Sequence, residues 1–266
     1  MRSLLLILLC AGCPKNRQAA VDLLAPLLAE ADAAWDARGR DGLDPVDAAL
    51  QRAYALRPQS PAVAWRLARV GVARGLTLDE PAARVAAFGA ARAQAWQCVL
   101  DDPRVHALRL ESGLEEALAS IPEERELCAT WAGHAWARWM VEFGAPGATL
   151  DLQDLDPLLA HARQSGADAW LTAWTDALLL AERPDWIGGD AEAATTGLRA
   201  VIKQRPDHVE PLVDLYLYVA RGTEAEASTR DTLAGAQPDT PEERAYVKRA
   251  LDLGATRKGN SPAGPQ

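Results

Sequence analysis

The sequence is poor in valine, isoleucine, phenylalanine and tyrosine, the residues typical of β-strands. Only two phenylalanines and four tyrosines occur among its 266 residues, whereas alanine is abundant. This composition favours helices over strands, and no convincing period-two alternation of apolar and polar residues is present. The net charge is −9, and no stretch concentrates lysine and arginine. We therefore expect no nucleic-acid partner.

The sequence also has no apolar run long enough to cross a membrane. Its N-terminal run, Leu4 to Leu9, is far shorter than the roughly 18 residues that a spanning helix needs. Arg2 precedes this run, and the small residues Ala11 and Gly12 follow it. This order is typical of a cleaved secretory signal peptide. We therefore predict that residues 1–12 are a signal peptide.

The cysteine directly after this segment resembles the lipidated cysteine of a bacterial lipobox. The resemblance implies that Cys13 is the lipid-attachment site and the mature N-terminus, with residues 13–19 as a tether. Pro14, rather than an aspartate, follows it. By resemblance to Gram-negative lipoproteins, this implies a periplasmic protein that is anchored through its N-terminal lipid to the outer membrane.

Two further cysteines, Cys98 and Cys128, would then lie in an oxidising compartment. They can form a disulfide, or they can be two separate buried thiols on helix faces. Their spacing in the sequence does not decide between the two arrangements, because it does not show whether the side chains meet.

Apolar residues recur at helical spacing over residues 20–254. Leu24, Leu28, Ala31 and Trp35 share one helix face. Asp44-Pro45, Ser60-Pro61 and Glu80-Pro81 indicate helix starts, and Arg57-Pro58 and Arg205-Pro206 indicate helix ends. We expect a connector over 104–120 with a short helical piece that ends near Ser120, a long helix from Pro122, and helices over about 154–165, 168–182, 190–205, 208–221, 223–235 and 241–253. The Gly/Pro/Ser-rich segment 255–266 is expected to be disordered.

Two distant segments share a pattern around their Arg-Pro pairs. Leu50–Ala68 and Leu198–Tyr216 each contain a leucine, an apolar residue three positions later, Arg-Pro, a short polar link and an apolar helix. Ala53 with Pro58, and Val201 with Pro206, have the spacing of a tetratricopeptide repeat junction. The sequence therefore predicts an all-α fold in which antiparallel helix hairpins stack as a TPR-like α-solenoid.

No constellation typical of a catalytic or metal site is present in the sequence. The four histidines are scattered, and none has a Cys, Asp or Glu at zinc-ligand spacing. The motifs of a nucleophile elbow and a phosphate-binding loop are absent. Gly188-Gly189 is interpreted as a tight turn in which Asp190 caps the next helix. We expect no enzymatic activity, no metal ligand and no cofactor.

Tryptophan is the unusual feature, with nine residues in the chain. Three indoles lie on two sides of one predicted helix, and two more lie at i and i+4 on another. Most of them are expected in the core, but some are candidates for a ligand groove or a subunit contact. These candidates are Trp131, Trp136, Trp139, Trp170 and Trp174.

The order of these motifs resembles the T component of TRAP transporters, the TatT-like lipoproteins. The resemblance rests on the lipobox-like start, the segment ADAAWDARGRDGLDPVDAALQRAYALRPQSPAVAWRLARV, the tryptophan-rich CATWAGHAWARW, the segment PDWIGGDAEAATTGLRAVIKQRPDHVEPLVDLYLYVAR and the closing PEERAYVKRALDL. It implies a periplasmic, lipid-anchored, non-enzymatic protein of degenerate tetratricopeptide hairpins. It also implies a homotrimer that docks the solute-binding protein of the transporter, around a pore for a hydrophobic ligand.

Two other interpretations remain open at the level of the sequence. The chain can be a generic TPR lipoprotein that acts as an adaptor in the assembly of outer-membrane or secretion machinery, because repeat folds bind many partners. It can also be an enzyme, which the lack of any nucleophile–base or metal constellation disfavours.

Overall fold

The computed structural model of the chain describes residues 14–144 and 151–258, and every regular element within them is a helix. The predicted signal peptide, Cys13 and most of the predicted tail lie outside these residues. Among the helices that the structure describes, none combines the length and the apolar character needed to cross a membrane.

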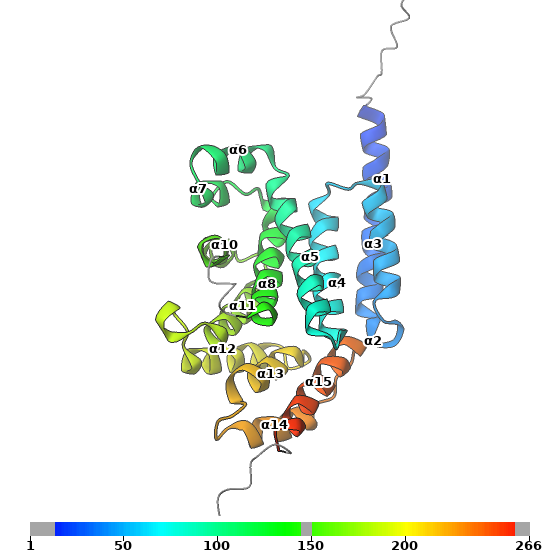
Figure 1. Cartoon of the computed structure of the whole chain (residues 1–266). Coiled ribbons are helices and arrows are strands. Elements are labelled where there is room, and N and C mark those ends of the chain that lie inside the picture. Colours follow the sequence, from blue (N-terminus) through cyan, green and yellow to red (C-terminus); the bar gives the residue numbers. More distant parts are fainter. Residues whose placement is uncertain (1–13, 145–150, 259–266) are drawn as a thin grey trace, which may run out of the picture.

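The helices follow one another with short connections (Figure 1). The first part of the chain forms α1 (Pro14–Asp36), α2 (Arg38–Asp41), α3 (Asp44–Leu56), α4 (Pro61–Thr77), α5 (Pro81–Leu100), α6 (Pro103–Glu111), α7 (Leu114–Leu118), the 3-10 turn η1 (Glu123–Arg125) and α8 (Glu126–Phe143). The second part forms α10 (Leu152–Ser165), α11 (Ala169–Glu182), the 3-10 turn η3 (Asp185–Ile187), α12 (Ala191–Gln204), α13 (Glu210–Asp214), the π-helical η4 (Leu215–Ala220), α14 (Glu226–Ala234) and α15 (Pro241–Lys258).

Neighbouring helices pack as pairs along the chain. In Figure 1, α1, α3, α4, α5 and α8 form a row of upright helices, and α12 to α15 lie across its lower part. Within the row, α1 packs on α3, α3 on α4, α4 on α5, and α5 on α8. In the second part, α11 packs on both α8 and α12, and α15 returns to contact α4. The last helix therefore closes the arrangement against the first half of the chain.

The side chain of Trp131 lies where three parts of the core meet. It is half-buried and packs against the cluster around α5, α8 and α10, against the cluster around α4, α8 and α15, and against the cluster of α11, α12 and η4. Burial of large aromatic side chains contributes strongly to folding. This residue therefore links the helix row to the helices below it.

The two segments with matching Arg-Pro pairs form matching junctions. Arg57, which follows α3, and Arg205, which follows α12, have φ/ψ angles of −146°/84° and −135°/78°. In both, the backbone N–H of the arginine donates to a carbonyl four residues earlier, on the buried Ala53 or Val201. Proline disfavours the helical conformation in the residue before it, so both helices end at the predicted place.

Several predicted boundaries differ from the structure. Helix α1 begins at Pro14 and α15 extends to Lys258, so the expected tether and the first part of the expected tail are helical. The expected connector over 104–120 consists largely of α6 and α7. Asp44, which the Asp44-Pro45 pair predicts as the capping residue, is instead the first residue of α3, and no side chain caps that helix. The predicted helix over 208–221 changes to π-helical geometry after Asp214.

Candidate functional site

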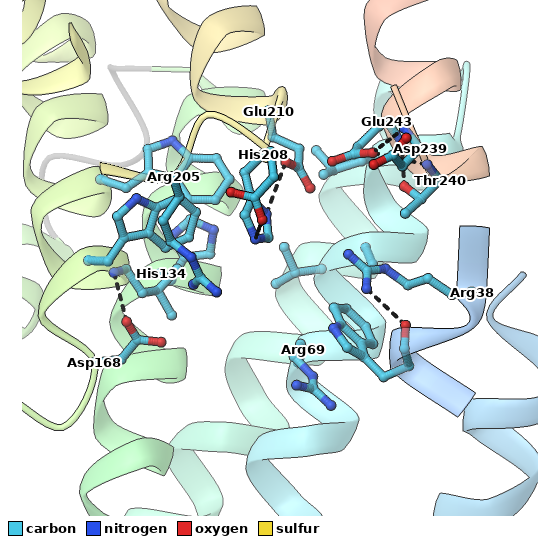
Figure 2. Close-up of a pocket in the computed structure, with 18 of the residues that line it drawn as sticks. Arg38, Arg69, His134, Asp168, Arg205, His208, Glu210, Asp239, Thr240 and Glu243 are labelled. Carbon is cyan, nitrogen blue, oxygen red and sulfur yellow. Dashed lines mark hydrogen bonds and ion pairs between the residues drawn. The ribbon is translucent and has the colours of Figure 1, made fainter. Parts of the chain in front are cut away.

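Six segments of the chain surround a cavity of about 440 Å³. We call this cavity the tryptophan pocket (Figure 2). Its lining residues come from the α1–α2 region, from α4, from α8, from the start of α11, from the α12–α13 loop and from the start of α15. They include Trp35, Arg38, Arg69, Trp131, His134, Asp168, Trp170, Trp174, Arg205, Asp207, His208, Glu210, Asp239, Thr240 and Glu243.

Indole rings form one wall of the tryptophan pocket. The ring centroids of Trp170 and Trp174 are 5.2 Å apart, because the two residues lie one turn apart on α11. The Nε1–H of Trp170 donates to the carbonyl of Val201 at 3.1 Å, and that of Trp174 donates to Oδ2 of Asp214 at 2.6 Å. Both N–H groups are thus occupied within the protein. A bound molecule would meet these rings chiefly as apolar surface.

His134 lies between two of the indoles and is 1% exposed. The hydroxyl of Thr175 donates to the carbonyl of Leu171, so its oxygen accepts a hydrogen bond from Nδ1–H of His134 at 2.9 Å. Burial and the positive charge of Arg138 lower the pKa of His134 well below its ordinary value of 6.5. The imidazole is therefore neutral at physiological pH and is a satisfied part of the pocket wall.

Two arginines approach Trp35 on the opposite side of the pocket. The Cζ atoms of Arg38 and Arg69 each lie 4.0 Å from the centroid of its ring, a distance typical of cation–π contact. Burial lowers the pKa of Arg69 to about 10, although Asp32 at 3.4 Å opposes this shift. Arg69 is therefore still charged at neutral pH. This side of the pocket is cationic.

Acidic side chains and a histidine form a third side, at the top of Figure 2. Nδ1 of His208 lies 3.6 Å from Oε2 of Glu210, and Glu243 approaches this pair from the start of α15. Burial raises the pKa of Glu243 above its ordinary value, and the charge of Glu210 adds to the shift. Burial also acts to raise the pKa of Glu210, but the neighbouring His208 outweighs it and holds that pKa below its ordinary value.

Glu243 also caps its own helix. Its Oε2 accepts hydrogen bonds from the backbone N–H groups of Asp239 at 2.9 Å and Thr240 at 3.0 Å. In return, Oγ1 of Thr240 accepts from the backbone N–H of Glu243 at 3.2 Å. This is a capping box at the N-terminus of α15, and it fixes the orientation of the Glu243 carboxylate beside the pocket.

The structure brings three of the five candidate tryptophans together. Trp131, Trp170 and Trp174 line the tryptophan pocket. Trp136 is 6% exposed and packs edge-on against Trp96 in the core, where its Nε1–H donates to Asp151. Trp139 is half-buried and stacks on Phe143 with ring centroids 4.7 Å apart.

The two internal cysteines meet between α5 and α8. Cys98 and Cys128 form a disulfide, with their Cα atoms 6.1 Å apart. Neither residue lies in the tryptophan pocket. Cys13 is outside the described residues.

Sequence reasoning missed most of the polar residues of the pocket. Thr240-Pro-Glu-Glu243 has the spacing of a capping box, so the start of α15 was readable from the sequence. His208 and Glu210 are two residues apart, but Glu243 comes from a different helix. No local pattern indicates that these three side chains meet.

The pocket combines an apolar indole wall with a cationic side and an acidic side. It can hold an organic molecule whose body stacks on indole and whose polar groups meet arginine or carboxylate. The chain matches no protein-family model, and no curated protein matches it significantly.

Proposed function

We propose that the chain is a lipid-anchored scaffold of the cell envelope that serves a TRAP-type transporter. In this proposal, it docks the periplasmic solute-binding protein of the transporter and takes a largely hydrophobic ligand into the tryptophan pocket. Its helix pairs are then degenerate TPR-like hairpins, and its role is binding and not catalysis. The order of motifs along the sequence supports the transporter assignment.

The observation that carries the proposal is the tryptophan pocket. Its volume of about 440 Å³ lies within the range of about 300–1,000 Å³ that is usual for small-molecule sites. Trp35, Trp131, Trp170 and Trp174 line it from three parts of the chain. Helical-repeat proteins use such concave surfaces for binding.

The disulfide between Cys98 and Cys128 supports the cellular location. Disulfides persist mainly in oxidising compartments such as the bacterial periplasm. A protein that is exported and lipidated at Cys13 would fold in that compartment. Palmitate labelling of the native chain, and its loss in Cys13→Ala, would support this anchor; equal labelling of both would contradict it.

The decisive experiment is isolation of the tagged full-length chain from native membranes in mild detergent, followed by mass spectrometry of the proteins that accompany it. We expect enrichment of a periplasmic solute-binding protein. The same complex should then form from the two purified proteins. Enrichment of an outer-membrane or secretion assembly machine instead would contradict the transporter proposal.

A matched pair of variants tests the pocket itself. Trp170 lines the pocket, whereas Trp65 is also half-buried but lies elsewhere, against Arg66. Native mass spectrometry should find a small molecule on the wild type and on Trp65→Leu, and a clear loss of it on Trp170→Leu. Equal occupancy of the two variants would show that the ligand binds outside the tryptophan pocket.

A further inference from the structure

We propose that His208, Glu210 and Glu243 form a binding site for a divalent transition-metal ion of the zinc type at the edge of the tryptophan pocket. The inference does not depend on the transporter assignment, since metal binding is a property of the purified chain. It also goes against the expectation from the sequence, which predicted no metal ligand.

The donor atoms are close enough to share one ion. One nitrogen of His208 and one carboxylate oxygen each from Glu210 and Glu243 all lie within 4.8 Å of one another. Zinc binds imidazole nitrogen and carboxylate oxygen at about 2.0–2.2 Å, so two ligands of one tetrahedral ion are about 3.4 Å apart. The donor atoms would therefore have to move toward one another when the ion binds.

The chemistry of the donor set selects the class of metal. One imidazole and two carboxylates suit zinc and its first-row neighbours. Calcium and magnesium prefer oxygen ligands only. Three protein ligands also leave a fourth position of a tetrahedral ion open.

One carboxylate oxygen of the cluster has no hydrogen-bond partner among the described residues. Oε2 of Glu210 is inaccessible to solvent and unpartnered, and Nδ1 of His208 lies 3.6 Å from it. The side chain of Glu210 is 12% exposed, and the whole residue Glu243 is 2% exposed. Within the described residues, neither glutamate forms an ion pair with lysine or arginine. Two buried carboxylates that face one another are unfavourable without a cation between them.

Neighbouring groups lie against two of the three donors. The ring of Trp170 lies 5.0 Å from that of His208, and Oδ2 of Asp207 lies 3.8 Å from Nε2 of His208. A carboxylate that accepts a hydrogen bond from the second ring nitrogen is the usual partner of a metal-binding histidine. At 3.8 Å, Asp207 would have to approach Nε2 to take this role. The backbone N–H groups of Asp239 and Thr240 fix Oε2 of Glu243, which leaves Oε1 of Glu243 for the ion.

Two simpler roles compete for these residues. A plain ion pair between protonated His208 and Glu210 accounts for one carboxylate, and the capping box accounts for Glu243. The variant Glu243→Gln separates these roles, because glutamine also completes a capping box but is a much weaker metal ligand. Its fold should be unchanged, while its affinity for the ion should fall.

The test is calorimetric titration of the purified full-length chain with Zn²⁺ after dialysis against a chelator, with a tag that contains no histidine. We expect one zinc ion whose binding is lost or strongly weakened in His208→Ala, Glu210→Gln and Glu243→Gln. In each of these three variants, the zinc affinity should fall by more than the about 10- to 100-fold that removal of an orienting partner causes. In Asp207→Asn, the zinc affinity should fall by about 10- to 100-fold.

His161→Gln is the matched control, because His161 also pairs with a glutamate, Glu126 at 2.8 Å, but lies outside the pocket. His161→Gln should bind zinc with the affinity of the wild type. Cys10 and Cys13 are unchanged in every variant, so any zinc bound by their thiols does not differ between the variants. Co²⁺ should give a tetrahedral visible spectrum in the wild type and in this control only. Zinc affinity of Glu243→Gln or Glu210→Gln equal to that of the wild type, with circular dichroism unchanged, would overturn the proposal.

Discussion

Asp214 is fully buried and accepts four hydrogen bonds from three other helices. Nη1 and Nη2 of Arg138 donate to its two oxygens at 2.7 and 2.8 Å. The hydroxyl of Tyr246 donates at 2.5 Å, and Nε1–H of Trp174 donates at 2.6 Å. Burial acts against the charge of Arg138, but the nearby carboxylate outweighs it and raises the pKa of Arg138. This side chain therefore joins α8, α11 and α15 behind the tryptophan pocket.

Replacing Asp214 with asparagine should destabilise the protein strongly. Loss of one partner of a buried ion pair leaves an uncompensated charge and costs about 3–5 kcal/mol. The control is Asp176→Asn. It disrupts an exposed ion pair in which Arg163 donates two hydrogen bonds to Asp176, at 2.7 and 2.8 Å, and should lower the free energy of unfolding by about 1 kcal/mol or less. Urea unfolding measures the stability of the two variants. Equal, small losses of stability in Asp214→Asn and Asp176→Asn would contradict the role assigned to Asp214.

Glu182 should make the stability of the protein depend on pH. Burial, followed by the charges of Asp214 and Glu142, raises the pKa of Glu182 from its ordinary value of 4.5 to about 7. Between these two values the folded chain binds more protons than the unfolded chain. The free energy of unfolding therefore decreases as the pH rises through this window.

The variant Glu182→Gln should remove this decrease. Above the window it should be more stable than the wild type, by at most about 3 kcal/mol, and below the window the two should be similar. Chemical unfolding at a series of pH values measures the difference. Glu224→Gln, at an exposed position, is the control and should follow the wild type. A Glu182→Gln variant that also follows the wild type would contradict the shift.

At the scale of elements, the turn before α12 shows how this chain separates its helices. Gly188 has a φ of +87°, a conformation that favours glycine. A Cβ atom on Gly189 would lie 1.8 Å from the carbonyl oxygen of Arg183. Asp190 then caps α12, since its Oδ1 accepts from the backbone N–H groups of Glu192 and Ala193 at 3.0 and 2.9 Å. The predicted turn and cap are both confirmed.

Gly189→Ala should therefore be among the most damaging single substitutions in a loop. The added methyl group would collide with backbone, so the turn must open, and we expect a loss of more than about 2 kcal/mol. Gly235→Ala is the control, because its Cβ would meet only ordinary contacts at 3.6 Å and should change stability by about 1 kcal/mol or less. Thermal unfolding, monitored by circular dichroism, compares the two variants. Similar unfolding midpoints for Gly189→Ala and Gly235→Ala would contradict the prediction.

Helix ends were predictable because their signals are local. Arg-Pro, Ser-Pro and Gly-Gly-Asp act within a few residues of the chain, through steric restriction or capping. The ends of α3 and α12 and the start of α4 lie where these signals predict. The prediction was weaker over 104–120, where the short helices α6 and α7 carry less periodic sequence. It also did not foresee the π-helical η4, which lies among packed helices.

At the scale of the whole molecule, the disulfide fastens α5 to α8 across a sequence separation of 30 residues. A cross-link that closes a loop of this length stabilises by about 2–4 kcal/mol. Reductant should therefore lower the urea midpoint of the wild type. It should not change the midpoint of a variant in which both Cys98 and Cys128 are alanine. Non-reducing peptide mapping should recover the two cysteine peptides joined, and two free thiols would contradict the pairing.

The tryptophan pocket exists only at this scale. Trp35 and Glu243 line the same cavity, although they lie near opposite ends of the described chain. They are brought together because α15 packs back against α4. This packing depends on which apolar faces fit one another, and no local sequence signal carries that information.

By itself, the sequence determined the all-helical class, most helix boundaries and the turn at Gly188-Gly189, because propensity, proline and capping act between near neighbours. It also identified tryptophan as the unusual residue. Only the tertiary structure decided which indoles share a pocket, that Cys98 meets Cys128, and that His208, Glu210 and Glu243 converge. These arrangements depend on how helices far apart in the chain pack together, and such contacts form only when the whole fold does.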